Sequence, residues 1–297
     1  ARSGQGGAGR QRRHSQQHPR LEQFQGLRRS RRALSPPMSA ARTSSPRTTS
    51  PRPTSRSRTP SLRVERGLQR QGYRLLAGMD EVGRGALAGP VSVGVVVIDE
   101  GCRSAPAGVR DSKLLSAPAR ERMVAPIRRW AHAHAVGHAA PVEIDQIGII
   151  AALRLAGVRA LAALPVTPDL VILDGNHDWL TAPEQVGLLG FVQDDESEAT
   201  RTPPVTTMIK ADLRCSSVAA ASVLAKVERD GLMVALGGEH PAYRWEINKG
   251  YAAPEHLAAL DLLGPCDLHR RSWRLRGPGS EVVERTDPTD SAPMRTR

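Results

Sequence analysis

Two adjacent acids, Asp80 and Glu81, are the residues of this sequence whose position most clearly points to chemistry. They end a short apolar run and are followed at once by a glycine-rich turn over residues 83–89. Carboxylates supply the oxygen ligands that divalent cations prefer, and a turn without bulky side chains lets a phosphate backbone approach. The pair therefore predicts a metal-dependent site for a phosphodiester, provided that other acids lie nearby.

Two further acids stand in similar positions. Asp174 directly follows the apolar run at 169–173, and Asp212 follows the run at 205–210. If these runs are neighbouring strands, the four carboxylates converge at one edge of a sheet and raise one another's pKa. Divalent cations remove that conflict, and an oxygen-only ligand set favours Mg²⁺ or Mn²⁺ over zinc. The alternative interpretation is that each acid is an ordinary solvated loop residue.

The hydrophobic pattern indicates which elements position these acids. Runs rich in Val, Leu and Ile predict strands, and apolar residues at helical spacing predict helices. The predicted strands span 75–80, 90–98, 169–173 and 205–210, and the predicted helices span 116–135, 142–164, 217–236 and 255–263. The first two strands should form a hairpin across the glycine turn. Strands and helices in alternation predict a mixed sheet flanked by helices.

Positive charge is concentrated at the N-terminal end. The chain of 297 residues has a net charge of +12, and residues 1–64 contain fifteen Arg, no Lys and one Glu. The remaining residues are therefore close to neutral. A segment so rich in Arg, Ser and Pro cannot bury enough apolar surface to offset its ordering entropy. We predict a disordered extension over 1–66, a globular domain over 67–276 and a flexible tail over 277–297.

This extension has more than one interpretation. It could attract nucleic acid electrostatically, or it could be a solvated segment of no fixed role. Its composition also fits an organellar transit peptide, although no amphipathic helix is evident. No apolar segment reaches the roughly 18 residues of a membrane span, so we expect no membrane anchor. Three widely spaced cysteines without a C-x-x-C pair argue against a disulfide framework or a zinc knuckle.

Seven blocks of the sequence resemble ribonuclease HII and occur in the order that the family has them. The blocks are DEVGRGALAGPV at 80–91, DSKLLS at 111–116, LDG at 173–175, IKAD at 209–212, SSVAAASVLAKVERD at 216–230, NKGY at 248–251 and HRRSW at 269–273. The resemblance covers residues 73–275. It implies an α/β architecture of the ribonuclease H-like type, with a mixed central sheet, flanking helices and a C-terminal helical segment.

The resemblance also implies an activity. It implies an endoribonuclease that cuts the RNA strand of RNA:DNA hybrids and the 5′ side of single ribonucleotides embedded in duplex DNA. The expected mechanism is two-metal-ion catalysis with Mn²⁺ or Mg²⁺, giving a 3′-hydroxyl and a 5′-phosphate. The expected role is the removal of ribonucleotides during DNA replication and repair. We expect a cytoplasmic monomer that binds nucleic acid and no membrane.

Carried over by position, the family's metal-binding catalytic acids are Asp80, Glu81, Asp174 and Asp212. The family's glycine turn senses the 2′-hydroxyl at the RNA–DNA junction, and here it consists of Gly83, Arg84 and Gly85. The lack of Cβ atoms lets backbone groups reach the sugar, and the 2′-hydroxyl is what separates RNA from DNA. A plain tight turn would explain the same glycines.

Further residues are expected to bind the substrate. Tyr251 matches the tyrosine that stacks beside the junction, and Lys113, Lys226 and Lys249 are candidate phosphate contacts. For each lysine, a surface or salt-bridge role is the alternative. His256 is expected to be structural.

Other positions are open or depart from the family pattern. Ser222 and Arg229 could contact phosphate or support the acids. Ala211, Glu228 and the pair at 252–253 differ from the residues that the family commonly has. A methyl group at Ala211 could shift Asp212 if that backbone requires a positive φ.

Three competing hypotheses remain. Ribonuclease HIII shares the expected fold and chemistry, but it has a folded N-terminal module where this chain has an Arg-rich segment. A noncatalytic nucleic-acid-binding protein would use the basic extension and would not need all four acids. An integrase-like nuclease would cut DNA, against which the glycine turn and Tyr251 argue.

Overall fold

The computed structural model describes residues 59–182, 202–275 and 277. Within these residues, five strands form one sheet in the order β3-β2-β1-β4-β5. The strands are β1 (Leu76–Val82), β2 (Val91–Ile98), β3 (Ala133–Ala139), β4 (Leu170–Asp174) and β5 (Val205–Met208). β1 is antiparallel to β2 and parallel to β4, so the sheet is mixed, as predicted.

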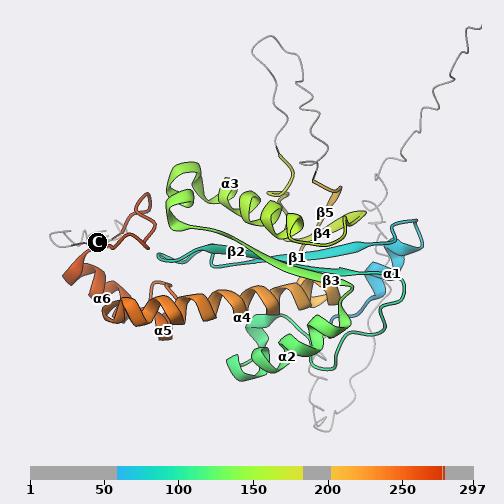
Figure 1. Cartoon of the computed structure of the whole chain (residues 1–297), viewed down its shortest axis with the longest axis horizontal. Helices are drawn as coiled ribbons and strands as arrows, with labels where there is room; N and C mark the ends of the chain where they lie inside the picture. The colour runs from blue at the N-terminus through green and yellow to red at the C-terminus, as the bar shows by residue number, and fades with distance from the viewer. Residues whose placement is uncertain (1–58, 183–201, 276, 278–297) are drawn as a thin grey trace, which may run out of the picture. The chain divides into compact units, whose positions relative to one another are not determined.

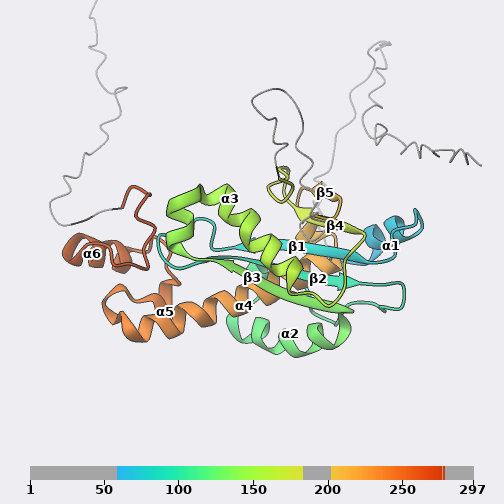
Figure 2. The same ribbon diagram turned by 45° about the horizontal axis from the view of Figure 1, so that its top comes forward.

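Helices cover both faces of this sheet (Figures 1 and 2). The helices are α1 (Arg63–Gln69), α2 (Ala117–Trp130), α3 (Pro141–Ala162), α4 (Ser216–Glu239), α5 (Trp245–Asn248) and α6 (Pro254–Leu263), with 3₁₀ turns η1 (Ser112–Leu114), η3 (Ala211–Leu213) and η4 (Pro241–Tyr243). α3 packs on β2 and β3, and α4 packs on β1 and β2 from the opposite side, with α2 against α4. The interior strand β2 is buried along its whole length, which explains its largely apolar sequence.

Small residues bring α4 directly against the sheet. A Cβ atom built on Gly78 of β1 would lie 2.4 Å from the backbone nitrogen of Val218 in α4. The first turns of α4 are rich in alanine and are fully buried. The sheet and this helix therefore approach closely, as the alanine-rich pattern predicted, and the turn η3 that leads into the helix is held near the ends of the strands.

One predicted helix was too long. The sequence predicted a helix over 116–135, but α2 ends at Trp130 and the chain then enters β3. β3 pairs with β2 in an antiparallel register that joins Ala133 to Val97. An edge strand of small residues and histidines has weak β-propensity of its own, so tertiary pairing decides its conformation.

The N-terminal boundary also differs from the prediction. α1 begins at Arg63, inside the segment assigned to the extension, and Glu65 in this helix is completely buried. One carboxylate oxygen of Glu65 accepts hydrogen bonds from the backbone N–H and the hydroxyl of Ser217, each at 3.0 Å. Because these contacts are with α4, α1 belongs to the globular domain.

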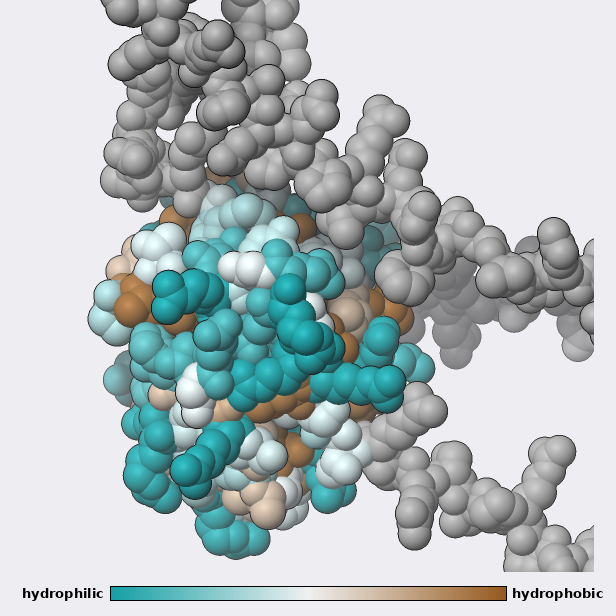
Figure 3. All heavy atoms as spheres, turned by 90° about the vertical axis from the view of Figure 1, so that its right-hand side faces the viewer, coloured by the Kyte–Doolittle hydropathy of each residue, from teal (hydrophilic) through white to brown (hydrophobic). Residues whose placement is uncertain are grey.

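Several predictions concern residues outside the described ones. These are the extension up to residue 58, the acidic segment with Asp194, Asp195, Glu196 and Glu198, and the tail after residue 277. In the part that is described, no helix is both long and apolar enough to cross a bilayer. The face seen in Figure 3 is mostly hydrophilic, with small separate hydrophobic patches. Cys102, Cys215 and Cys266 are all free, as predicted.

Candidate functional site

Three aspartates meet where β1 and β4 end. The two strands are parallel, and their register pairs Met79 with Leu173, so the next residues, Asp80 and Asp174, lie side by side. Side chains alternate between the two faces of a strand, which directs both carboxylates toward α4. Asp212 lies in η3, the turn that leads into α4. The topology therefore brings three acids together from distant parts of the chain.

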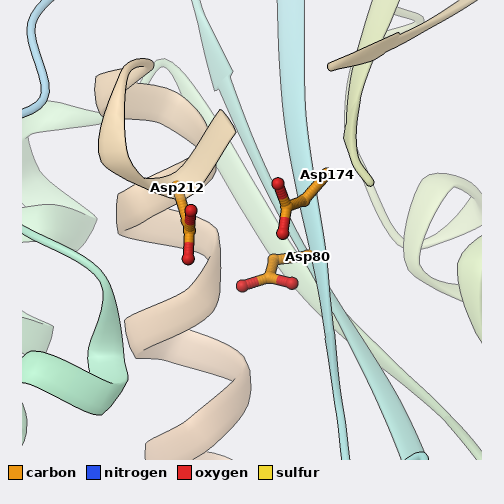
Figure 4. A group of neighbouring side chains, drawn as sticks. All are labelled: Asp80, Asp174 and Asp212. Atoms are coloured by element: carbon orange, nitrogen blue, oxygen red, sulfur yellow. The ribbon is translucent and has the colours of Figure 1, made fainter. Parts of the chain in front are cut away.

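The carboxylates of Asp80, Asp174 and Asp212 point toward one another (Figure 4). One oxygen of each lies within 4.8 Å of the others. Asp80 and Asp212 are only 4% and 6% exposed, whereas Asp174 is partly exposed. The backbone N–H of Ala211 donates to Asp174 at 2.7 Å, which attaches the turn η3 to β4. Oxygen ligands at this spacing can coordinate a divalent cation.

The electrostatics of the cluster also fit a cation. Burial raises the pKa of Asp80 well above its usual value, and the charges of Glu81 and Asp174 raise it further. Burial and then Asp174 raise the pKa of Asp212 to about 6. Three acids in this arrangement repel one another, and Lys113 offsets only part of that repulsion. A divalent cation would remove the conflict, so the residues present suit the metal that the sequence predicted.

Glu81 is the one predicted acid that does not join this group. It follows Asp80 directly in β1, so its side chain points to the opposite face of the sheet. Its carboxylate lies 3.6 Å from the guanidinium group of Arg84. Burial raises the pKa of Glu81, the Arg84 charge lowers it, and Asp174 contributes to raising it. Glu81 therefore lies close enough to feel Asp174 but is not part of the aspartate cluster.

Lys113 lies beside the aspartates in a turn with its own supports. Burial lowers the pKa of Lys113, but Asp80 and Asp111 more than offset this, so its pKa is raised. Asp111 accepts a hydrogen bond from the Lys113 N–H at 2.9 Å and begins η1. The hydroxyl of Ser222 accepts one from the Ser112 N–H at 3.1 Å. Ser222 therefore supports this turn, and Asp111 is a buried acid that the sequence analysis did not single out.

The glycine turn lies against Tyr251. Gly83 has φ of 82°, and a Cβ atom there would lie 2.0 Å from the Arg229 Nε atom. The Gly83 N–H donates to the hydroxyl of Tyr251 at 3.2 Å. The Tyr251 ring lies 5.4 Å from the guanidinium carbon of Arg229 and 5.6 Å from the ammonium of Lys226. Around Gly85, by contrast, an added Cβ would meet nothing within 4 Å.

The other two lysines occupy different environments. Lys226 forms an ion pair with Asp230 at 2.8 Å. Lys249 adopts a left-handed conformation with φ of 54°, and its ammonium donates to the carbonyl of Glu246. Both lie near Tyr251 in space or sequence, and neither acts on the pKa of the aspartates as Lys113 does.

The departures from the family pattern are accommodated. The residue of this turn with a positive φ is Lys210, not Ala211. The methyl group of Ala211 therefore causes no backbone strain. Glu228 is hydrogen-bonded to His138, with 3.0 Å between Oε1 and Nε2. His256 is fully buried and hydrogen-bonded, as expected of a structural residue.

A cavity of about 580 Å³ lies at the other end of the strands. Its lining residues are Arg74, Leu75, Asp99, Glu100, Gly101, His132 and Asp169. These residues lie before β1 and β4 or after β2, so the cavity is separate from the aspartate cluster. We assign the chemistry to the cluster because, among the described residues, its three aspartates are the acids whose oxygen atoms come within 4.8 Å of one another.

Comparisons with known proteins agree with this geometry. The family model described as Ribonuclease HII matches residues 77–276. A ribonuclease HII from Streptomyces avermitilis is 47% identical over 215 residues, which is 72% of this chain and 83% of that protein. One from Nitrosococcus oceani is 46% identical over 199 residues, covering 67% of this chain and 88% of the relative.

Two solved structures are similar in fold. The crystal structure of ribonuclease H2 from Pyrococcus horikoshii has a TM-score of 0.51 at 26% identity and covers 67% of this chain and 94% of that one. RNase HII from Archaeoglobus fulgidus, solved in a complex with PCNA, has a TM-score of 0.50 at 26% identity and covers 67% and 93%.

Proposed function

Since the chain belongs to the ribonuclease HII family and is a ribonuclease H that cleaves RNA in RNA:DNA hybrids, we propose which of its residues carry out the cleavage and which further substrates it cuts. We propose that it also cuts on the 5′ side of single ribonucleotides in duplex DNA. We assign the catalytic centre to Asp80, Asp174 and Asp212, with Glu81 as a fourth acid. The convergence of three aspartate oxygens within 4.8 Å carries this proposal.

The enzyme depends on divalent metal, as its family does, and we propose that the ions are Mg²⁺ or Mn²⁺. When bound, two such ions supply activation of a water molecule and stabilisation of the leaving oxygen. Asp80 and Asp174 on the strand ends and Asp212 on η3 would hold them. Glu81 can take part only if its side chain leaves Arg84, which lies 3.6 Å away. The products would be a 3′-hydroxyl and a 5′-phosphate.

The surrounding residues can bind the nucleic acid. We propose that the turn of Gly83, Arg84 and Gly85 contacts the 2′-hydroxyl of the substrate. Two observations support this: the space around Gly85 is open, and the hydroxyl of Tyr251 fixes Gly83 by accepting its N–H. Tyr251 offers a ring on which a nucleotide can stack. Lys113 has the clearest phosphate role.

The other two lysines are weaker candidates for phosphate contacts. Lys226 and Lys249 already have protein partners, Asp230 and the carbonyl of Glu246, which a phosphate would have to displace. We retain both as proposed contacts at the edge of the site.

The proposal also covers the cell context. We propose that the enzyme acts as a monomer. The relatives from Streptomyces avermitilis and Nitrosococcus oceani are bacterial enzymes, and the DNA of a bacterium lies in its cytoplasm, where we propose that this enzyme removes ribonucleotides during replication and repair. The basic segment that precedes α1 would then be an appendage to a catalytic domain that includes α1 and ends near residue 276.

One assay tests the function. A duplex with a single ribonucleotide, a continuous RNA:DNA hybrid and an all-DNA duplex are incubated with Mg²⁺ or Mn²⁺. We expect the first two to be cut, the third to remain intact, and Asp80→Asn to lose at least a hundredfold in kcat. Arg271→Lys, a change of an exposed arginine paired with Asp267, is the control.

Two results would contradict the proposal. If the all-DNA duplex is cut as fast as the others, the chain is a general nuclease of the integrase-like kind. If wild-type protein binds the duplexes but cuts none of them with either metal, it is a noncatalytic binder.

A further inference from the structure

Two buried arginines, Arg229 and Arg270, lie beneath the glycine turn. Neither side chain has any exposed surface. All their hydrogen bonds go to backbone carbonyl groups. Arg270 donates to the carbonyls of Gly83, Arg84 and Gly89 at 2.6, 2.9 and 3.2 Å, and Arg229 donates to those of Ala88, Pro90 and Lys249 at 3.2, 2.8 and 3.0 Å. Five carbonyls between residues 83 and 90 are therefore directed toward positive charge.

These two cations have an unusual environment. Among the described residues, the ion pairs of the protein include neither Arg229 nor Arg270. Burial, followed by the charge of Arg229, lowers the pKa of Arg270 to about 9. Carbonyl groups and two aromatic rings, those of Tyr251 and Trp273, are their immediate partners. Burying a charge without a carboxylate partner costs free energy. We therefore look for a role of the two arginines in the backbone segment whose carbonyls they bind.

A guanidinium group suits this task better than an ammonium group. Its planar fork of five N–H donors can bind several carbonyls in fixed directions, whereas the three donors of lysine rotate about one point. Arg270 uses this fork to join the beginning of the turn, at Gly83, to its end, at Gly89. The two arginines therefore fix the direction of these carbonyls, of which the carbonyl of Gly83 also accepts the N–H of Ala86 at 3.2 Å.

The N–H groups of the turn have a complementary arrangement. The N–H of Gly83 donates to Tyr251, and those of residues 86–89 donate to backbone carbonyls. In the described structure, the N–H groups of Arg84 and Gly85 donate to no protein acceptor, and both residues are exposed. With the carbonyls drawn inward, the tip of the turn offers two free donors to a ligand.

We propose that Arg229 and Arg270 are positioning residues that hold these two donors in the geometry needed to recognise a ribonucleotide. The inference rests on the proposed function, since it concerns how the turn selects its substrate. The arginines touch neither the aspartates nor the substrate and act through the backbone of residues 83–90. Their loss should therefore reduce substrate selection more than metal binding.

Arg270→Lys and Arg229→Lys test this, with Arg271→Lys as the matched control in the neighbouring exposed position. Three quantities are measured on the full chain: kcat/KM on the single-ribonucleotide duplex, kcat/KM on the continuous hybrid, and the affinity for Mn²⁺. We expect the ratio of the two kcat/KM values to fall at least tenfold in both buried-site variants, with Mn²⁺ affinity and the control unchanged. A simple loss of folded protein would lower both kcat/KM values equally and leave their ratio unchanged.

Hydrogen exchange provides a second measurement that needs no activity. The N–H groups of residues 86–89 should exchange at least tenfold faster in the two variants, while those of β1 keep their protection. An unchanged substrate ratio, or unchanged exchange of the turn, in folded variants would overturn the inference and leave the proposed function intact. A wild-type protein that does not distinguish the ribonucleotide duplex from all-DNA would instead overturn the proposed function, and the selection argument with it.

Discussion

At the scale of single residues, two glycines of the same turn serve different purposes. Gly83 combines a left-handed backbone with a Cβ position only 2.0 Å from Arg229, so the fold itself requires glycine there. Gly85 has no positive φ, and an added Cβ would meet nothing within 4 Å. The folded protein therefore gives no reason for glycine at Gly85, whereas a closely approaching substrate does.

Gly85→Ala should separate folding from recognition. Because the site is open and the backbone is not left-handed, the change should alter the free energy of unfolding by no more than about 0.5 kcal/mol. The added methyl group should lower kcat/KM on the single-ribonucleotide duplex at least tenfold. Urea unfolding and steady-state kinetics give the two values. Gly67→Ala in α1, which also has free space, is the control and should leave the kinetics unchanged.

The aspartate cluster predicts how metal affinity depends on pH. Burial and the charge of Asp174 raise the pKa of Asp212 to about 6 in the metal-free protein. A protonated carboxyl is a poor ligand, so protons should compete with the metal below that pH. We expect Mn²⁺ affinity, measured by calorimetry, to fall steadily from pH 7 to pH 5. Asp212→Asn should bind weakly throughout and show a flatter profile; an identical profile would contradict this assignment.

At the scale of elements, the C-terminal helices hold Tyr251 through a buried network. His256 Nδ1 donates to the Tyr251 carbonyl at 2.8 Å, so His256 Nε2 must be an acceptor. It can then receive Trp245 Nε1 at 3.2 Å and His269 Nε2 at 3.0 Å. Both histidines are fully buried and neutral in this arrangement. The network connects α5, α6 and the segment after them to the residue that contacts Gly83.

This network should make stability sensitive to acid. Burial, and then the proximity of His256, lowers the pKa of His269 from 6.5 to about 4, so the unfolded chain takes up the proton first. The stability that the neutral form contributes is present above pH 6.5 and is lost as the pH falls toward 4. The loss should reach at most about 3 kcal/mol.

Thermal unfolding at several pH values checks the prediction. His269→Gln should lower Tm at pH 7 but reduce the further fall between pH 7 and pH 5. The exposed His177 provides the control, and His177→Gln should follow the wild-type profile. A His269→Gln profile parallel to that of the wild type would refute the assignment.

At the scale of the whole molecule, the N-terminal charge and the N-terminal helix have separate roles. Residues 1–58 contain fourteen Arg and one Glu, whereas α1 carries the buried Glu65 that binds Ser217 at the start of α4. We expect the first feature to act on affinity for nucleic acid and the second to act on the stability of the domain.

Two deletions should distinguish them. Removal of residues 1–58 should leave Tm and cleavage nearly unchanged, while the salt dependence of duplex binding becomes shallower because fewer counterions are released. Removal of residues 1–70 should also lower the free energy of unfolding, since Ser217 loses its acceptor at a cost of about 1–3 kcal/mol. Fluorescence anisotropy at several salt concentrations and urea unfolding provide the measurements. Equal stability of the two deletions would show that α1 contributes nothing to the fold.

Local patterns in the sequence predicted four of the five strands, most of the helices and the acids at the strand ends. These features depend on local patterns, since an apolar run that stops at an acid is visible in any window of ten residues. The same holds for α4, whose alanines predicted its close packing. Where the local pattern was too weak to predict the secondary structure, the prediction was wrong. The edge strand β3 is the example, since it forms because β2 is available to pair with it.

How these residues act together depends on contacts that the folded chain makes between distant segments. The register of β1 and β4 directs Asp80 and Asp174 to one face and Glu81 to the other, which adjacency in sequence could not reveal. Arg270 reaches the turn from 187 residues away, and its role depends on carbonyl groups that carry no sequence signal. The residue types of the glycine turn and its acid pair were therefore enough to predict a site. The geometry of that site comes from contacts between residues that are distant in the sequence and meet in the folded chain.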